Sequence, residues 1–95
     1  MQTTDSQKII SRFFQALYYL KSERVIRGKQ TFTAKFGINR WNLNTLEKDM
    51  ARDIFQPAWL SYLVEEYDIS AEWLLTGRGD IMSRRRKIRK EEATR

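Results

Sequence analysis

The residues best suited to specific chemistry lie on one side of a short helical pattern from Arg40 to Lys48. Leu43 and Leu46 are three residues apart, so they supply the buried side of this pattern. The other side carries hydrogen-bonding groups and one aromatic ring, on Arg40, Trp41, Asn44, Thr45 and Lys48. Arginine donates two hydrogen bonds to guanine, and asparagine pairs in a similar way with adenine. This face therefore predicts contacts with the edges of DNA bases.

A second amphipathic pattern precedes this one, and a glycine separates the two. Phe32 and Phe36 are four residues apart and share one face of a helix. Gly37 and Ile38 form a tight turn, and Asn39 stands where a helix N-cap belongs. Two helices joined by such a turn form a helix-turn-helix, whose second helix enters the major groove.

The remaining residues predict three further helices. The first begins at Ser6 and carries an apolar stripe that reaches Leu20, and residues 22–28 connect it to the helix-turn-helix. After a loop over residues 49–56, Pro57 opens a fourth helix, and Ser70 caps a fifth that Gly77 ends. Gly79-Asp80 is a turn. The predicted fold class is all-α, with about five helices, and Trp59 and Trp73 are expected in the core or at a subunit interface.

Composition excludes several kinds of site. The 95 residues contain no cysteine and no histidine, so a thiolate nucleophile, a histidine base and the usual zinc sites are all excluded. The carboxylates of Glu65, Glu66, Asp68 and Glu72 are interpreted as charges on the outer face of a helix. We expect no catalytic residue, no metal and no cofactor. No signal peptide and no membrane-spanning run is evident, so a cytoplasmic protein without a membrane partner is expected.

The charge is unevenly distributed along the chain, whose formal net charge is +6. Residues 24–52 hold seven basic and two acidic residues, whereas residues 53–80 hold one basic and six acidic residues. Residues 83–95 hold seven basic and two acidic residues. The helix-turn-helix is therefore the basic part of a polarised domain, as expected of a protein that binds nucleic acid.

Two sequence blocks resemble a known family. The first is Phe32-x-x-x-Phe36-Gly37-Ile38-Asn39-x-x-x-Leu43-x-x-Leu46-Glu47, and the second runs from Tyr67 to Gly77 and contains Trp73-Leu-Leu-Thr-Gly. Both are similar to the helix-turn-helix domains of lambdoid phage repressors and their XRE-like bacterial relatives. The resemblance implies a compact five-helix lambda-repressor-like DNA-binding domain over residues 6–80, followed by a basic C-terminal tail over residues 81–95.

The resemblance also implies roles for single residues. Arg40, Trp41, Asn44 and Thr45 correspond to the positions that face bases in the family, although Trp41 could instead pack on a neighbouring helix. The start of the second helix and the end of the third usually touch phosphates, at positions that correspond to Lys29, Gln30 and Lys48. Glu47 is expected to pair with a basic residue of the first helix, for which Arg12, Lys21 and Arg24 are open candidates. Thr33 stands where the family usually has alanine.

The expected function is that of a sequence-specific, repressor-type transcriptional regulator that binds double-stranded DNA as a homodimer. The alternative is a protein-interaction module on the same fold without sequence-specific readout. Three roles stay open for the basic run Arg84–Lys90: an arm that adds phosphate affinity, a helix that pairs subunits, or a solubilising terminus.

Overall fold

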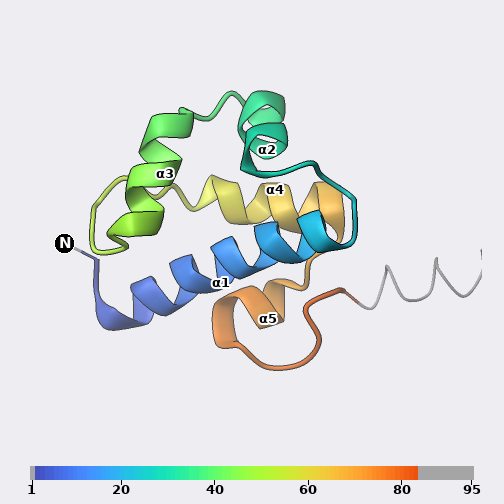
Figure 1. Ribbon diagram of the computed structural model, residues 1–95. Helices are drawn as coiled ribbons and strands as arrows, with labels where there is room; N and C mark the ends of the chain where they lie inside the picture. Colours follow the sequence, from blue (N-terminus) through green and yellow to red (C-terminus); the bar gives the residue numbers. More distant parts are fainter. Residues whose placement is uncertain (1, 84–95) are drawn as a thin grey trace, which may run out of the picture. The chain divides into compact units, whose positions relative to one another are not determined.

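The computed structural model describes residues 2–83, and these residues form five helices and no strand (Figure 1). The all-α class predicted from the sequence is therefore confirmed for this part of the chain. The helices belong to two units, Met1–Gln56 and Pro57–Arg95. Helices α1, α2 and α3 belong to the first unit, and α4 and α5 belong to the second.

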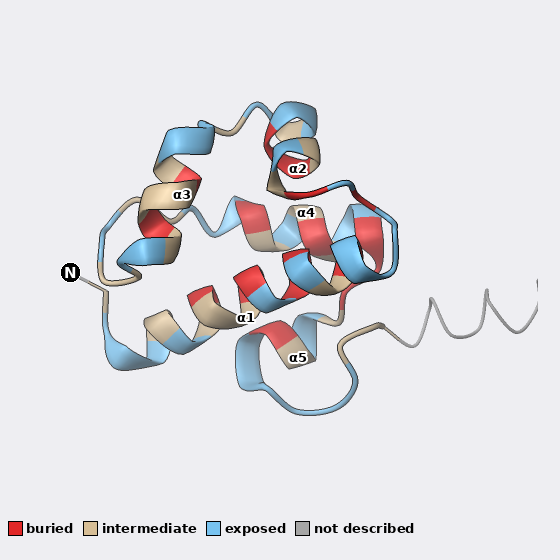
Figure 2. Cartoon of the chain, in the orientation of Figure 1, coloured by how far each residue is buried: buried red, intermediate tan, exposed pale blue. Residues whose placement is uncertain are grey.

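Helix α1 (Thr4–Ser22) supplies most of the core of the first unit. It begins two residues before the predicted Ser6, because the Thr3 hydroxyl caps it by accepting a hydrogen bond of 3.1 Å from the Ser6 N–H. Its apolar stripe is buried, as Figure 2 shows, over Ile10, Phe13, Phe14, Ala16, Leu17 and Leu20.

An aromatic cluster around Phe13 joins α1 to the rest of this unit. The fully buried Phe13 ring makes edge-to-face contacts with Phe14, Phe32 and Phe55, at centroid separations of 5.2, 5.7 and 5.4 Å. Such pairs stabilise a fold by about 0.5–1.5 kcal/mol each beyond the burial of their area. The Phe55 contact also holds the loop after α3, which was predicted over residues 49–56.

Helices α2 (Lys29–Phe36) and α3 (Arg40–Lys48) form the predicted pair around a glycine turn. Gly37 ends α2 in the left-handed conformation, with φ of 65°, and its N–H donates to the Thr33 carbonyl. The Asn39 side chain accepts a 3.0 Å hydrogen bond from the Asn42 N–H and so caps α3. The predicted bounds of the third helix and its cap are confirmed.

Thr33 is accommodated inside this unit. Its side chain is 4% exposed, and its hydroxyl donates a 3.2 Å hydrogen bond to the Gln30 carbonyl in the preceding turn of α2. The hydroxyl therefore has a partner, and no buried polar atom is left unsatisfied at this position.

The second unit contains α4 (Ala58–Tyr67) and α5 (Ala71–Thr76). Pro57 precedes α4 with a helical φ of −55°, so its missing N–H removes no bond from the helix. The Ser70 hydroxyl caps α5 by accepting a 3.1 Å bond from the Trp73 N–H, and Gly77 ends the helix with φ of 77°. The predicted Ser70 cap and Gly77 stop are both confirmed.

The chain after α5 returns to the connection between α4 and α5. The Ser70 N–H donates to the Ile81 carbonyl and the Ser83 N–H to the Asp68 carbonyl, both at 2.7 Å. One antiparallel bridge, Ile69 with Met82, lies between these bonds. Gly79, in the predicted turn, has φ of 81° and so helps the chain to reverse.

The two tryptophans of the second unit differ in burial: Trp59 is 5% exposed, whereas Trp73 is half-buried. Within residues 2–83, no helix is both long enough and apolar enough to cross a membrane. The basic run 84–90 lies outside the described residues, and so does most of the predicted tail over residues 81–95.

Candidate nucleic-acid interface

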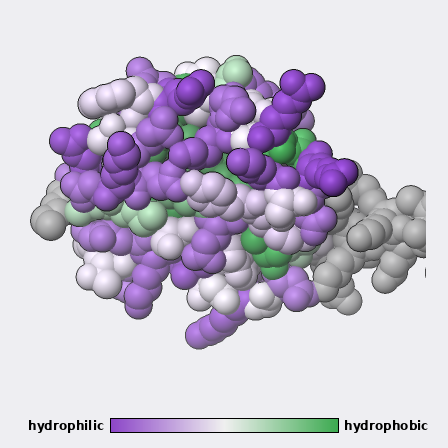
Figure 3. All heavy atoms as spheres, viewed as in Figure 1, coloured by the Kyte–Doolittle hydropathy of each residue, from purple (hydrophilic) through white to green (hydrophobic). Residues whose placement is uncertain are grey.

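The outward face of α3 is formed by the side chains predicted for it. Arg40, Trp41 and Lys48 are exposed, and Trp41 has 68% of its surface accessible to solvent. Asn44 and Thr45 are half-buried, which leaves part of each side chain accessible to a ligand. The inner side consists of Leu43 and Leu46, which are completely buried. The surface over α3 in Figure 3 is accordingly mostly hydrophilic.

The start of α2 carries the other two predicted site residues. Gln30 is exposed and Lys29 is half-buried, and Gly28 before them provides no side-chain cap for the helix. Since α2 and α3 belong to the same unit, the structure brings all seven predicted site residues onto two helices joined by one short turn.

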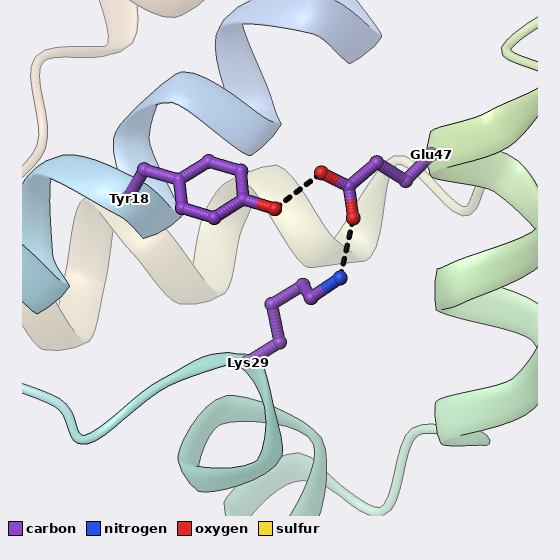
Figure 4. A network of polar contacts seen from close by, with 3 residues as sticks. All are labelled: Tyr18, Lys29 and Glu47. Carbon is purple, nitrogen blue, oxygen red and sulfur yellow. Dashed lines mark hydrogen bonds and ion pairs between the residues drawn. The ribbon is translucent and has the colours of Figure 1, made fainter.

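Glu47 connects these two helices to α1 through both of its carboxylate oxygens (Figure 4). Its Oε2 accepts a hydrogen bond from the hydroxyl of Tyr18 on α1. Its Oε1 accepts one from the Nζ of Lys29, with which it also forms an ion pair. The expected basic partner on the first helix is thus replaced: a neutral tyrosine occupies that position, and the cation comes from α2.

These contacts shift the pKa values of both acidic groups. Partial burial alone raises the pKa of Glu47, but hydrogen bonds from Lys29 and Tyr18, together with the Lys29 charge, outweigh burial and lower it. The hydrogen bond to Glu47, with smaller contributions from burial and from the Glu47 charge, raises the pKa of Tyr18. Glu47 is therefore an anion and Tyr18 a neutral donor at neutral pH.

The stabilisation from this network is modest. The Lys29 and Glu47 side chains are 26% and 25% exposed, and ion pairs open to solvent contribute only about 0–1 kcal/mol. The network also determines the charge of α3, because Glu47 is the single acidic residue within this helix. With that carboxylate paired to Lys29, the cations Arg40 and Lys48 set the charge of the outward face of α3.

Tyr18 is a residue of this site that the sequence does not predict. This residue lies outside the buried stripe of α1 and is 47% exposed, so its spacing indicates only a surface position. No sequence signal connects it to Glu47, because the two residues are 29 positions apart and meet only after α1 and α3 have packed.

One of the four carboxylates interpreted as surface charges behaves differently. Glu65, Glu66 and Glu72 are exposed, whereas Asp68 is 7% exposed. Asp68 ends α4 in the left-handed conformation, with φ of 57°, and its carbonyl accepts the bond from Ser83. Its burial follows from this cap position, because the returning segment pairs with it.

The outward face of α3 thus presents two exposed cations and three further side chains that can hydrogen-bond or stack, on the helix that follows the predicted glycine turn. Comparison of this chain with models of protein families, with curated proteins and with solved structures found no match to any of them.

Proposed function

We propose that this protein is a sequence-specific regulator of the repressor type that binds double-stranded DNA with a lambda-repressor-like helix-turn-helix. The observation that carries this proposal is the exposure of the polar face of α3, set on the fully buried pair Leu43 and Leu46. A helix that supports only the fold needs no such arrangement of arginine, tryptophan, asparagine and threonine on its solvent side.

The dimensions of α3 suit the major groove. Its nine residues place Arg40 and Lys48 about 12 Å apart along the helix axis, at 1.5 Å per residue. The major groove is about 12 Å wide and admits one helix. A helix with its side chains is about 10–12 Å in diameter, so α3 fits this width and its outward side chains face the base edges.

Base contacts are assigned to the first two turns of α3. Arg40 donates two hydrogen bonds to guanine O6 and N7, and Asn44 pairs with adenine. Thr45 can hydrogen-bond to guanine or to adenine, and Trp41 packs against the methyl group of thymine. Each well-formed bidentate contact discriminates against a wrong base by about 1–3 kcal/mol.

Phosphate contacts are assigned to Lys29, Gln30 and Lys48. Lys29 already pairs with Glu47, but an ammonium group has three N–H donors, and Glu47 takes one of them. The remaining donors serve a phosphate without loss of the ion pair. A homodimer would then place its two α3 helices in half-sites about one helical turn apart, and the bound dimer would block access of other proteins to that segment.

The exposure of Trp41 supports a second candidate function, a protein-interaction module on the same fold. A tryptophan with 68% of its surface exposed is typical of the aromatic anchors found in protein interfaces. In that case the face of α3 binds a protein surface, and the basic residues give only unspecific affinity for nucleic acid.

Selection of bound duplexes from a random DNA library separates the two functions. A consensus of two inverted half-sites is the result expected from the regulator. Enrichment of no sequence, despite measurable binding of random duplex, contradicts it and favours the interaction module. Repeating the selection without residues 83–95 gives the control: binding that disappears entirely with this segment does not come from the helix-turn-helix.

A further inference from the structure

We infer that Tyr18 is a positioning residue for DNA reading, which fixes the rotation of α3 about its own axis through Glu47. The inference rests on the proposed function and extends it to a residue of α1 that faces no base. Its basis is the pair of hydrogen bonds in Figure 4, in which one carboxylate joins α1, α2 and α3.

The packing of α3 leaves its rotation weakly defined without this carboxylate. Its two fully buried residues, Leu43 and Leu46, form one narrow stripe along a helix of nine residues. A helix seated on one stripe can roll about that line at little loss of apolar contact. A directional bond beside the stripe resists such a roll, because hydrogen bonds weaken steeply when their angle changes.

Glu47 lies at the right place for this purpose. At about 100° per residue, it is offset from Leu43 by about 40° around the axis, at the edge of the buried stripe. Trp41, Thr45 and Lys48 lie on the far side, so a roll of the helix displaces them all together. Lys29 and Tyr18 approach the two carboxylate oxygens from two different helices, which restrains the side chain in both directions.

The role is one of specificity more than of affinity. A recognition site must hold its side chains within about 0.5 Å and 10–20° of the productive geometry. Phosphate contacts tolerate a larger rotation, because an ammonium group at the end of a flexible stem follows its partner. Loss of the Tyr18 bond should therefore weaken the reading of bases and leave unspecific attraction intact.

The test compares the full chain with its Tyr18→Phe variant, which removes the hydroxyl and retains the ring. Dissociation constants are measured for the duplex that the wild type selects and for a scrambled duplex of equal length and composition. We expect the affinity of Tyr18→Phe for the selected duplex to fall about threefold to tenfold. Its affinity for the scrambled duplex should change by less than about twofold. Tyr62→Phe, the same substitution on α4, is the matched control and should change neither constant.

Three outcomes of the DNA measurements contradict the inference or its basis. Equal affinities of Tyr18→Phe and wild type for the selected duplex exclude a positioning role. A parallel loss on both duplexes, with a lower melting temperature, shows a structural role only. If the wild type selects no duplex, the proposed function itself fails. Amide hydrogen exchange gives a second measurement without DNA. The Tyr18→Phe substitution should accelerate exchange in α3 more than in α4, and an equal acceleration in both helices contradicts the inference.

Discussion

Lys29 and Glu47, eighteen residues apart, form an ion pair that connects the first residue of α2 to the last turn of α3. The pair spans both helices of the helix-turn-helix and is the point at which the charge of the proposed interface is balanced. A positive and a negative group at this place cancel locally, so removal of one of them changes what an approaching phosphate meets.

Glu47→Gln should increase affinity for random duplex. The substitution keeps the size of the side chain, removes its charge and leaves the whole Lys29 ammonium available to a phosphate. The Glu47 carboxylate no longer repels the phosphate that Lys29 contacts, so the affinity rises while the number of phosphate contacts stays the same. Electrophoretic titration with random duplex measures the affinity of both proteins.

Glu65→Gln on α4 is the control for this prediction, because it makes the same change in net charge outside the proposed interface. A rise in affinity of equal size in both variants shows a general effect of net charge. No rise in Glu47→Gln excludes Lys29 from contact with phosphate.

The contribution of the network to stability should depend on pH at both ends of the range. The pKa of Glu47 is lowered in the folded state, so its contribution is present above the ordinary value of 4.5 and is lost as the pH falls through the folded-state pKa. The pKa of Tyr18 is raised, so its contribution is present below 10.0 and is lost as the pH rises through the folded-state pKa. The difference in unfolding free energy between wild type and Glu47→Gln should therefore be largest between pH 4.5 and 10.0.

Urea denaturation from pH 3 to 11 measures this difference. The network is partly open to solvent, so the losses of stability at low and at high pH should both be small. They should therefore be measured as the difference in unfolding free energy between wild type and Glu47→Gln. A difference that is constant over the whole range would show that neither group is perturbed by folding.

Local signals explain why the bounds of the helices were predictable. Asn39 caps α3 within three residues of its own position, and Gly37 sets the turn by its own conformation, so neither depends on distant packing. The same holds for Ser70 and Gly77 around α5. The start of α1 was predicted two residues late, because the apolar stripe begins well inside the helix and the cap at Thr3 carries no apolar signal.

The candidate site was predictable only in part, for a related reason. The outward face of α3 follows from the spacing of Leu43 and Leu46, which a sequence displays directly. The partners of Glu47 do not follow, because three helices must pack before Tyr18 and Lys29 approach the same carboxylate. The pattern of residues within a single helix therefore predicts that helix, whereas polar contacts between helices become visible only in the structure.

Gly37→Ala should destabilise the first unit by about 1–2 kcal/mol, the cost of placing a Cβ in the left-handed conformation. No heavy atom lies within 4 Å of the Cβ that alanine would add, so the loss comes from backbone strain without a steric clash. Gly37→Asn should cost less, because asparagine adopts this conformation more readily. Urea denaturation measures both variants, and equal losses for alanine and asparagine would contradict this explanation.

Arg40→Ala should reduce affinity for the selected duplex alone. Loss of one bidentate contact to guanine removes about 1–3 kcal/mol of discrimination, or roughly 5-fold to 150-fold in the ratio of selected to random affinity. Arg78→Ala, which removes an exposed arginine from the second unit, is the matched control. Equal losses of Arg40→Ala on selected and random duplex would assign Arg40 to phosphate and would leave base reading to Asn44 and Thr45.

Lys48→Ala should weaken binding to every duplex by a similar factor, because a phosphate contact carries no sequence information. The salt dependence should become shallower by about 0.9 in the log–log slope, since one fewer counterion is released. Lys8→Ala provides the control, because Lys8 is an exposed lysine of α1 outside the proposed interface. Lys48 follows Glu47 directly, so the fold must be checked by circular dichroism. An unchanged slope with normal helicity would place the end of α3 away from the DNA backbone.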